Sequence, residues 1–511
     1  MDNNRKHLFG TSEKSDFIIN LTDEGTKKLC AMYCIVAMIF IELAAIPYYL
    51  TKNVVDYNEN IGGMDFPHYL SDKVIYWAGV VMLGFGLLGL SIFLIGRMKK
   101  QFSLADNKAL LLLAGVTVMS FISALAAENL VCSMTGYLDR GEGMLTLVGY
   151  YGFFAAAFTV VGDGWRKRLC AAVTAIGAVN AVIGILQVIP TFSDILPNWF
   201  ASLNTSFTAG YKVPAANGLA MTPHALAALL TVAFAASFAG AVFSGKLPHK
   251  LLYGGACILM AAAAQMTRTV TGLIGIGCAA FFIIVIAVIY AVKGNKEPEE
   301  HDNTADKKLR PGAAAAVASA LCVLLLAGGA VGGSIAAQMS SYPESDGYKT
   351  FYDEEVIRTD SIRMLMLLEK EDQDTWVYPY LWDDGIFITE QTPLLGVGPD
   401  NWETAAGYGA TIDRTYNEYI DTLMQRGVIT AALYVLFLLV TLIKAVKAMI
   451  SFIKGEANWA AAAVMAAVFA YSVQAFFNIS SLESSPFFFI FAGLAWSYGA
   501  VKKKKAAPAK D

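Results

Sequence analysis

Arginines beside apolar segments are the residues of this sequence best suited to chemistry. Arg268 joins two apolar runs with almost no loop between them. An arginine this close to hydrocarbon usually faces a bundle interior or a water-filled cavity, because exposure to lipid is costly. Its guanidinium is a rigid fork of donors that matches phosphate oxygens and stays charged at any relevant pH. The alternative is an arginine at a helix end whose side chain extends to the lipid headgroups.

Three further arginines are candidates for the same outer cavity as Arg268. They are Arg140, Arg363 and Arg414, and each is also explained as an ordinary loop residue. Arg363 follows Asp360 by one helical turn, and such a surface pair contributes only about 0.3–0.5 kcal/mol. If the arginines converge, they suit a pyrophosphate diester and would offset the charge that develops on a leaving phosphate. Such a site requires neither a metal ion nor a cofactor.

A glycine turn closes the longest polar segment of the chain. Gly396 and Gly398 flank a turn too tight for side chains, where a backbone can approach a ligand. A plain tight turn is the alternative. The stretch RTYNEY (414–419) then leads into the next apolar run, and Asp413 and Glu418 are acidic groups in or beside it.

Composition shows that these residues belong to a membrane protein. The chain has 511 residues, of which 56% are hydrophobic and 16% charged, whereas soluble domains carry about 25% charged residues. A transmembrane helix needs about 20 mostly apolar residues. Runs of this kind lie near 29–50, 74–96, 108–127, 144–162, 169–188, 223–243, 251–267, 270–292, 313–338, 427–447, 458–477 and 486–501. We therefore expect an all-α polytopic membrane protein with about twelve transmembrane helices and one large extracytoplasmic loop.

The distribution of Lys and Arg predicts the orientation. Most of the 38 Lys and Arg residues fall in alternate connections if both termini are cytoplasmic, as the positive-inside rule requires. The expected order is a cytoplasmic tail at 1–28, nine transmembrane helices within 29–338 with a cytoplasmic linker at 293–312, a large extracytoplasmic loop at 339–426, three transmembrane helices within 427–501, and a basic cytoplasmic tail at 502–511.

Charge, cysteine and histidine patterns exclude several classes of function. The segment 339–426 holds 18 acidic residues and six basic ones, so it is not a nucleic-acid surface. The seven cysteines lie mostly inside apolar runs, which leaves no disulfide framework. The five histidines form no cluster and none falls in the large loop, so we expect no histidine metal site. Carboxylate oxygens remain a possible ligand set for a hard cation.

Five stretches, in order along the chain, carry a family resemblance. They are GYLDRGEGMLTLVGYYGF (136–153), MTPHALAALL (221–230), MTRTVTGLIGIG (266–277), RTDSIRMLML (358–367) and the glycine-turn segment 392–427. They resemble the motifs of the O-antigen ligase and O-antigen polymerase superfamily, whose carboxy-terminal signature has the form PLxGxGxxxF followed by HNxYL. The resemblance extends from about residue 128 to the carboxy terminus.

The resemblance implies a function and an environment. Members of this superfamily are polytopic glycosyltransferases of the bacterial cytoplasmic membrane that act at its outer face. They transfer glycan from a polyprenyl-pyrophosphate donor to a glycan or lipid-linked acceptor, with inversion at the anomeric carbon. The resemblance makes Arg268, Arg363, Arg140 and Arg414 candidates for donor binding. It adds Gly396, Gly398 and Asn417 as further substrate-binding candidates.

One motif position departs from the family pattern. Tyr416 stands where the motif usually has histidine, and a phenol with an ordinary pKa near 10 is a poor base at neutral pH. Either neighbouring arginines lower the pKa of Tyr416, or a carboxylate, Glu418 or Asp413, accepts the proton of the attacking hydroxyl. We favour the carboxylate because it is ionised already. Tyr416 would then orient the acceptor or only pack at the helix start.

Two alternatives to a glycan polymerase remain. A ligase that moves a finished glycan onto a lipid, protein or wall acceptor shares the same motifs, although the absent histidine disfavours it. A transporter or flippase would also explain twelve spans. Transporters usually place charged binding residues and broken helices near the midplane, and the apolar runs here are nearly free of charge.

The orientation can be tested by cysteine labelling in intact cells. Glu300→Cys lies in the predicted cytoplasmic linker and Asp374→Cys in the predicted outer loop. A membrane-impermeant maleimide should label the cysteine at 374 and leave the one at 300 unlabelled until the cells are lysed, with the unmodified chain as control. Labelling at 300 without labelling at 374 would invert the topology and with it the expected catalytic face.

Overall fold

The structure is a computed structural model, and it describes most of the apolar part of the chain. The described residues are 23–44, 66–98, 108–136, 141–160, 162–189, 205–208, 211–293, 313–341, 377–401 and 414–498. Arg140, Arg363 and Asp413 lie outside these ranges, as does most of the predicted outer loop. The predictions made for those residues therefore stay predictions.

Every one of the twelve apolar runs contributes to a helix. The helices are α1 (Asp23–Ala44), α3 (Phe66–Met98), α4 (Lys108–Ala126), α6 (Met144–Phe158), α7 (Asp163–Val188), α9 (Pro223–Phe243), α10 (Leu247–Met266), α11 (Val270–Lys293), α12 (Ala313–Ser341), α17 (Glu418–Ile453), α18 (Ala460–Gln474) and α19 (Ser485–Ser497). Shorter helices are α5 (Leu130–Thr135), α15 (Val377–Gln391) and the 3-10 turn η6 (Ala475–Phe477).

Seven helices of the described chain are long and apolar enough to cross a membrane. They are α7, α9, α10, α11, α12, α17 and α18 together with η6. Shorter apolar segments lie in α3, α4, α6 and α19. The protein is therefore a helical, multi-pass membrane protein, and the crossing of all twelve helices stays a prediction. The described residues also form one small antiparallel hairpin, β1 (Thr205–Thr208) and β2 (Tyr211–Pro214), with Thr205 opposite Pro214.

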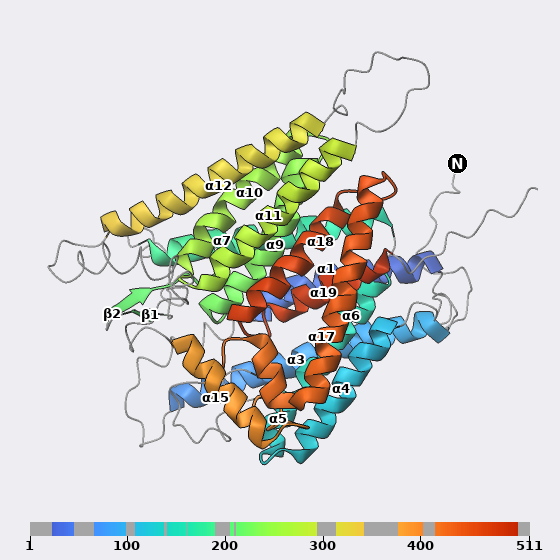
Figure 1. Ribbon diagram of the computed structural model, residues 1–511, viewed down its shortest axis with the longest axis vertical. Helices are drawn as coiled ribbons and strands as arrows, with labels where there is room; N and C mark the ends of the chain where they lie inside the picture. The colour runs from blue at the N-terminus through green and yellow to red at the C-terminus, as the bar shows by residue number, and fades with distance from the viewer. Residues whose placement is uncertain are drawn as a thin grey trace, which may run out of the picture.

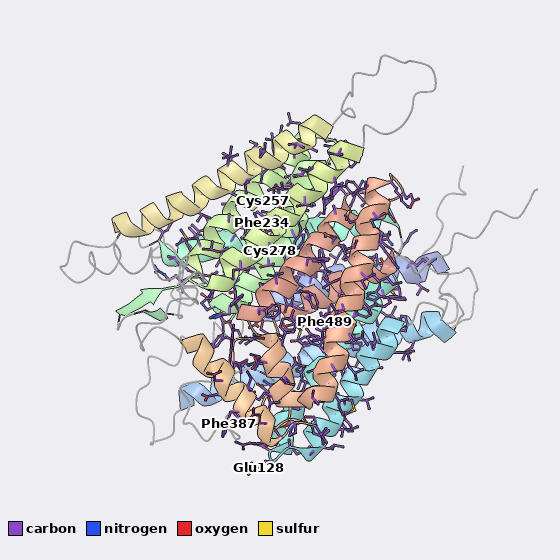
Figure 2. The ribbon with its side chains drawn as sticks, in the orientation of Figure 1. Glu128, Phe234, Cys257, Cys278, Phe387 and Phe489 are labelled. Atoms are coloured by element: carbon purple, nitrogen blue, oxygen red, sulfur yellow. The ribbon has the colours of Figure 1, made fainter. Side chains whose placement is uncertain are left out.

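Burial separates the central helices from those at the edge of the bundle. In α9, 94% of the most apolar window is buried inside the protein, against 22% in α12. Helix α9 packs against α7, α10, α11 and α18, whereas α12 lies along one side of the bundle (Figure 1). The exposed leucines of α12 suit contact with lipid. Figure 2 places Phe489 of α19 in the middle of the molecule and Glu128 at one end of it.

The half of the bundle that holds the site is built on close helix contacts. Helix α6 packs against α3 and α19, and α17 packs against α4, α18 and α19. Where α3 crosses α6, a Cβ atom on Gly152 would lie 1.8 Å from the carbonyl oxygen of Gly86. Glycine is required there because small residues let two membrane helices approach backbone to backbone. This contact fixes α6, whose first turn carries part of the site.

Candidate functional site

The site is organised around a break in α17. Gly427 has φ 77° and ψ 170°, which interrupts the helix between Glu418 and Ile453. The predicted apolar run began at residue 427, but the helix itself starts at Glu418 and bends at that glycine. A break frees backbone groups that must find partners inside a membrane protein. The N–H of Val428, just after the break, donates to the carbonyl oxygen of Pro393 at 2.9 Å.

The glycine turn supplies the other partners of the broken helix. The N–H of Val397 donates to the carbonyl oxygen of Met424 at 3.1 Å, and the N–H of Gly398 donates to that of Gln425 at 2.8 Å. The hydroxyl of Ser123 on α4 donates a further hydrogen bond to the Gln425 carbonyl at 3.0 Å. The glycine turn and the part of α17 before the break are thus hydrogen-bonded to each other.

The glycines of this contact have no room for a side chain. A Cβ on Gly396, where φ is 68°, would lie 2.5 Å from the Met424 carbonyl oxygen. A Cβ on Gly398, where φ is 103°, would lie 2.4 Å from the hydroxyl of Ser133. The protein itself fills the space beside both glycines, with the backbone of α17 at Gly396 and the side chains of Ala127 and Ser133 at Gly398. Ligand contact at Gly396 and Gly398 stays a prediction.

Asp400 follows the turn and forms the central ion pair. Its N–H donates to the side-chain oxygen of Gln425 at 3.0 Å, which helps to hold its left-handed backbone, where φ is 56°. Its carboxylate accepts a hydrogen bond at 3.1 Å from the guanidinium of Arg414. Both side chains are almost fully buried. Breaking such a pair by removing one partner costs about 3–5 kcal/mol, because the other charge stays buried.

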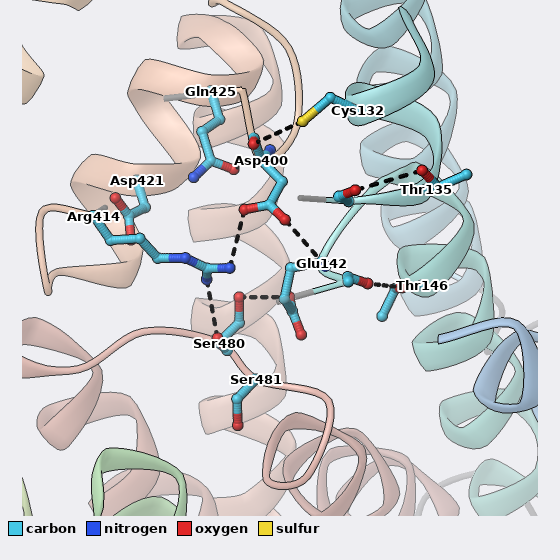
Figure 3. A network of polar contacts seen from close by, with 12 residues as sticks. Cys132, Thr135, Glu142, Thr146, Asp400, Arg414, Asp421, Gln425, Ser480 and Ser481 are labelled. Carbon is cyan, nitrogen blue, oxygen red and sulfur yellow. Dashed lines mark hydrogen bonds and ion pairs between the residues drawn. The ribbon is translucent and has the colours of Figure 1, made fainter. Parts of the chain in front are cut away.

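Glu142, just before α6, joins the ion pair to the segment that precedes α19. Its N–H donates to Asp400 at 3.2 Å, and its carboxyl accepts from the hydroxyl of Ser480 at 2.9 Å (Figure 3). The carboxyl also accepts from the phenol of Tyr150. Arg414 also donates to the Ser480 carbonyl oxygen at 3.1 Å. Burial raises the pKa of Glu142, while the positive charge of Arg414 opposes that rise.

These residues border a cavity between α4, α6, α17 and α19. The cavity contains about 500 Å³ of space, including the part open to solvent. It is lined by Leu113, Val116, Leu147, Tyr150, Arg414, Glu418, Asp421, Thr422, Gln425, Arg426, Tyr434, Ser480 and Phe489. Apolar side chains of α4, α6 and α19 and charged and hydroxyl groups of α17 and the segments before it share this lining.

Three of the predicted site residues lie at the start of α17. Asn417 caps the helix by accepting from the N–H groups of Tyr419 and Ile420 at 3.0 and 3.2 Å, a common role for asparagine. Glu418 accepts a hydrogen bond from the phenol of Tyr434, and its second oxygen is buried without a hydrogen-bond partner. Tyr416 has φ 50°, and backbone strain of this kind is concentrated at functional sites.

The ring of Tyr416 lies against a histidine. Its centroid is 4.9 Å from that of His224, the first-turn residue of α9. The carbonyl of His224 in turn accepts a hydrogen bond from Asn478 at 3.1 Å. The motif position that lacks a histidine is therefore next to one contributed by another helix. Sequence analysis did not reveal this contact, because residues 224 and 416 are joined only by the tertiary fold.

The arginines predicted to bind substrate lie in different places, and their roles stay predictions. Arg414 lines the cavity, and Arg268 does not. Arg268 is buried in the short connection between α10 and α11, in a left-handed conformation with φ 54°. Arg426 lines the cavity beside Arg414 and was missed from the sequence. The available signal was an arginine directly before a glycine where an apolar helix begins. Among the described residues, no group of three or more metal-binding side chains occurs.

A comparison with protein families shows what part of this site is similar to. Residues 255–435 match the family model described as O-antigen ligase. The matched segment includes the glycine turn, the ion pair between Asp400 and Arg414, and the broken helix up to Val435. No curated protein matched the chain. The match supports the superfamily predicted from the motifs, while Glu142 and Ser480 lie outside the matched residues.

The break in α17 can be tested by substituting its glycine. Gly427→Ala would place a Cβ 2.1 Å from the carbonyl oxygen of Leu394, so it should disrupt the contact between the turn and the helix. Gly455→Ala is the matched control, since Gly455 has a similar φ of 79° but open space around it. The control should lose only about 1–2 kcal/mol for its left-handed backbone. Thermal unfolding of the purified proteins in detergent should show a much larger loss for Gly427→Ala, and equal losses would contradict the argument.

Proposed function

We propose that the protein transfers or polymerises glycan from a polyprenyl-pyrophosphate donor onto an acceptor sugar hydroxyl. The reaction takes place at the outer face of a bacterial cytoplasmic membrane, in the assembly of a cell-surface polysaccharide. The observation that carries the proposal is the position of the cavity. Its arginines Arg414 and Arg426 both lie within the segment that matches the O-antigen ligase family.

The donor would be bound through its pyrophosphate. The candidates are Arg268, Arg363, Arg140 and Arg414, whose guanidinium groups match phosphate oxygens in shape and charge. The cavity offers Arg414 beside an apolar wall, which is the combination that a lipid-linked phosphate needs. As the glycosidic bond breaks, negative charge grows on the leaving pyrophosphate, and fixed cations stabilise it without a metal ion.

The transfer step would invert the anomeric carbon. The acceptor oxygen forms a bond to that carbon from the face opposite the pyrophosphate, which leaves with the electron pair of the broken C–O bond. The proton of the acceptor hydroxyl passes to a carboxylate, Glu418 or Asp413. Glu418 lines the cavity and has one carboxylate oxygen without a partner, which supports it as the acceptor of that proton. Tyr416, and Asn417 beside it, would orient the acceptor.

A polymerase and a ligase differ only in the acceptor. A polymerase extends a lipid-linked glycan, whereas a ligase moves a finished glycan to a lipid, protein or wall acceptor. A transporter or flippase would bind the same lipid-linked substrate but would break no glycosidic bond. Release of polyprenyl pyrophosphate in a reconstituted assay distinguishes both transferases from it, and the size of the glycan product then distinguishes polymerase from ligase.

Loss of an arginine should remove donor binding. Arg268→Ala and Arg363→Ala should each abolish glycan transfer at unchanged protein levels in the membrane. Lys at either position should recover little, because an ammonium cannot reproduce bidentate contact with phosphate. A chelator should have little effect on the same lipid-linked oligosaccharide assay. Near-full activity of both alanine variants would reject the arginine clamp, and loss with the chelator that magnesium rescues would point to a carboxylate-bound cation.

The identity of the base can be tested by comparing conservative variants across pH 6 to 10. Tyr416→Phe should retain a measurable fraction of activity, since the phenol only orients the acceptor. Glu418→Gln or Asp413→Asn should lose far more, because an amide cannot accept the proton. All variants must be compared at equal expression. An inactive Tyr416→Phe with active carboxylate variants would make the phenol the catalytic group, and loss confined to His224→Asn would transfer that role to the neighbouring imidazole.

A further inference from the structure

Arg426 lines the cavity and has no paired anion among the described residues. It occupies the last position of α17 before the break at Gly427, and its side chain lines the cavity. Its Nε atom is buried and makes no hydrogen bond. Within the described part of the chain, no hydrogen bond or ion pair involves its guanidinium. Arg414, the other arginine of the cavity, is held by Asp400.

The acidic side chains of this site accept hydrogen bonds from other groups. Asp400 is paired with Arg414. Glu142 accepts from Tyr150 and Ser480, Glu418 accepts from Tyr434 through one of its two oxygens, and Asp421 accepts from Thr415. Glu142 and Glu418 attract Arg426 through space, but within the described part of the chain neither forms an ion pair with it. A half-buried guanidinium whose Nε makes no hydrogen bond is costly without a paired anion, so its position beside a cavity favours a negatively charged ligand.

The apolar wall of the cavity restricts what that ligand can be. Leu113 and Val116 of α4 face the cavity from one side, and Leu147 and Phe489 face it from another. The outer surface of α4 exposes Leu111 and other large apolar side chains, as expected of a helix next to lipid. Helix α4 therefore lies between the cavity and this exposed apolar surface. A free soluble anion would gain nothing from this wall, whereas a phosphate carried on an isoprenoid or acyl chain would.

We propose that Arg426 binds the phosphate group of a lipid-linked substrate in the cavity between α4, α6, α17 and α19. The inference rests on the proposed function and names a phosphate-binding residue for it. The guanidinium meets the phosphate oxygens, and the apolar residues cover the first part of the lipid chain.

Binding of defined lipids to the purified full-length protein in lipid nanodiscs tests the inference. The probes are a short-chain polyprenyl pyrophosphate, the corresponding polyprenol and inorganic pyrophosphate. The variants are Arg426→Met and Arg426→Lys. The control is Arg168→Met, which removes an exposed arginine of α7 that stacks on Trp165.

The unchanged protein should bind polyprenyl pyrophosphate more tightly than polyprenol or inorganic pyrophosphate. Arg426→Met should weaken binding of the lipid pyrophosphate at least tenfold, Arg426→Lys should weaken it less, and Arg168→Met should leave it unchanged. Thermal unfolding without ligand distinguishes this role from a structural one. Removal of an unpaired charge should leave the unfolding temperature unchanged or raised, while a residue needed for packing would lower it.

Three results would overturn the inference. One is an Arg426→Met variant that binds the lipid pyrophosphate as tightly as the unchanged protein. Another is inorganic pyrophosphate binding as tightly as the lipid form, which would make this a soluble-anion site. The third is an Arg426→Met variant that unfolds at a clearly lower temperature. A glycan-transfer assay keeps the two proposals separate, because binding that depends on Arg426 without any transfer would reject the function and retain the site.

Discussion

The pairing between a broken helix and a glycine turn is the interaction on which the rest of the site depends. Helix α17 cannot bend at Gly427 inside a membrane protein unless its freed backbone groups find partners. Residues 393–398 provide them through the hydrogen bonds of Pro393, Val397 and Gly398. The pairing requires glycine at three positions, where a Cβ would meet backbone or a neighbouring side chain. The pairing therefore has a structural role, and it sets the positions of the residues that would contact a ligand.

The charged residues of the cavity take their positions from that pairing. Asp400 follows the turn directly, and its N–H is held by Gln425 from the turn of α17 that precedes the break. Asp400 then orients Arg414 and the backbone of Glu142. Each of these groups forms a hydrogen bond with the next one. Four segments that are distant in sequence are therefore held together at one point. A polar network in an apolar bundle stays ordered when its members are paired, and among the described residues Arg426 lies beside this network without joining it.

The sequence predicted where the helices lie because long apolar runs mark them. Each of the twelve apolar runs contributes to a helix, and the family match supports the motifs identified in the carboxy-terminal half. The break in α17 could not be predicted in the same way. The sequence places Gly427 at the start of an apolar run, and only the structure shows that helix lies on both sides of it and that residues 393–398 bond to the break.

The residues that line the cavity differ in how easily the sequence identifies them. The segment that matches the O-antigen ligase family contributes Arg414, Glu418 and Arg426. The walls that enclose these groups come from α4, α6 and α19, which lie outside that segment and whose apolar composition resembles that of any membrane helix. Glu142 and Ser480 lie just before α6 and in the segment before α19, also outside the matched residues, yet they complete the network around Arg414. The matched segment alone therefore cannot form the cavity, which depends on helices that precede and follow it in the chain.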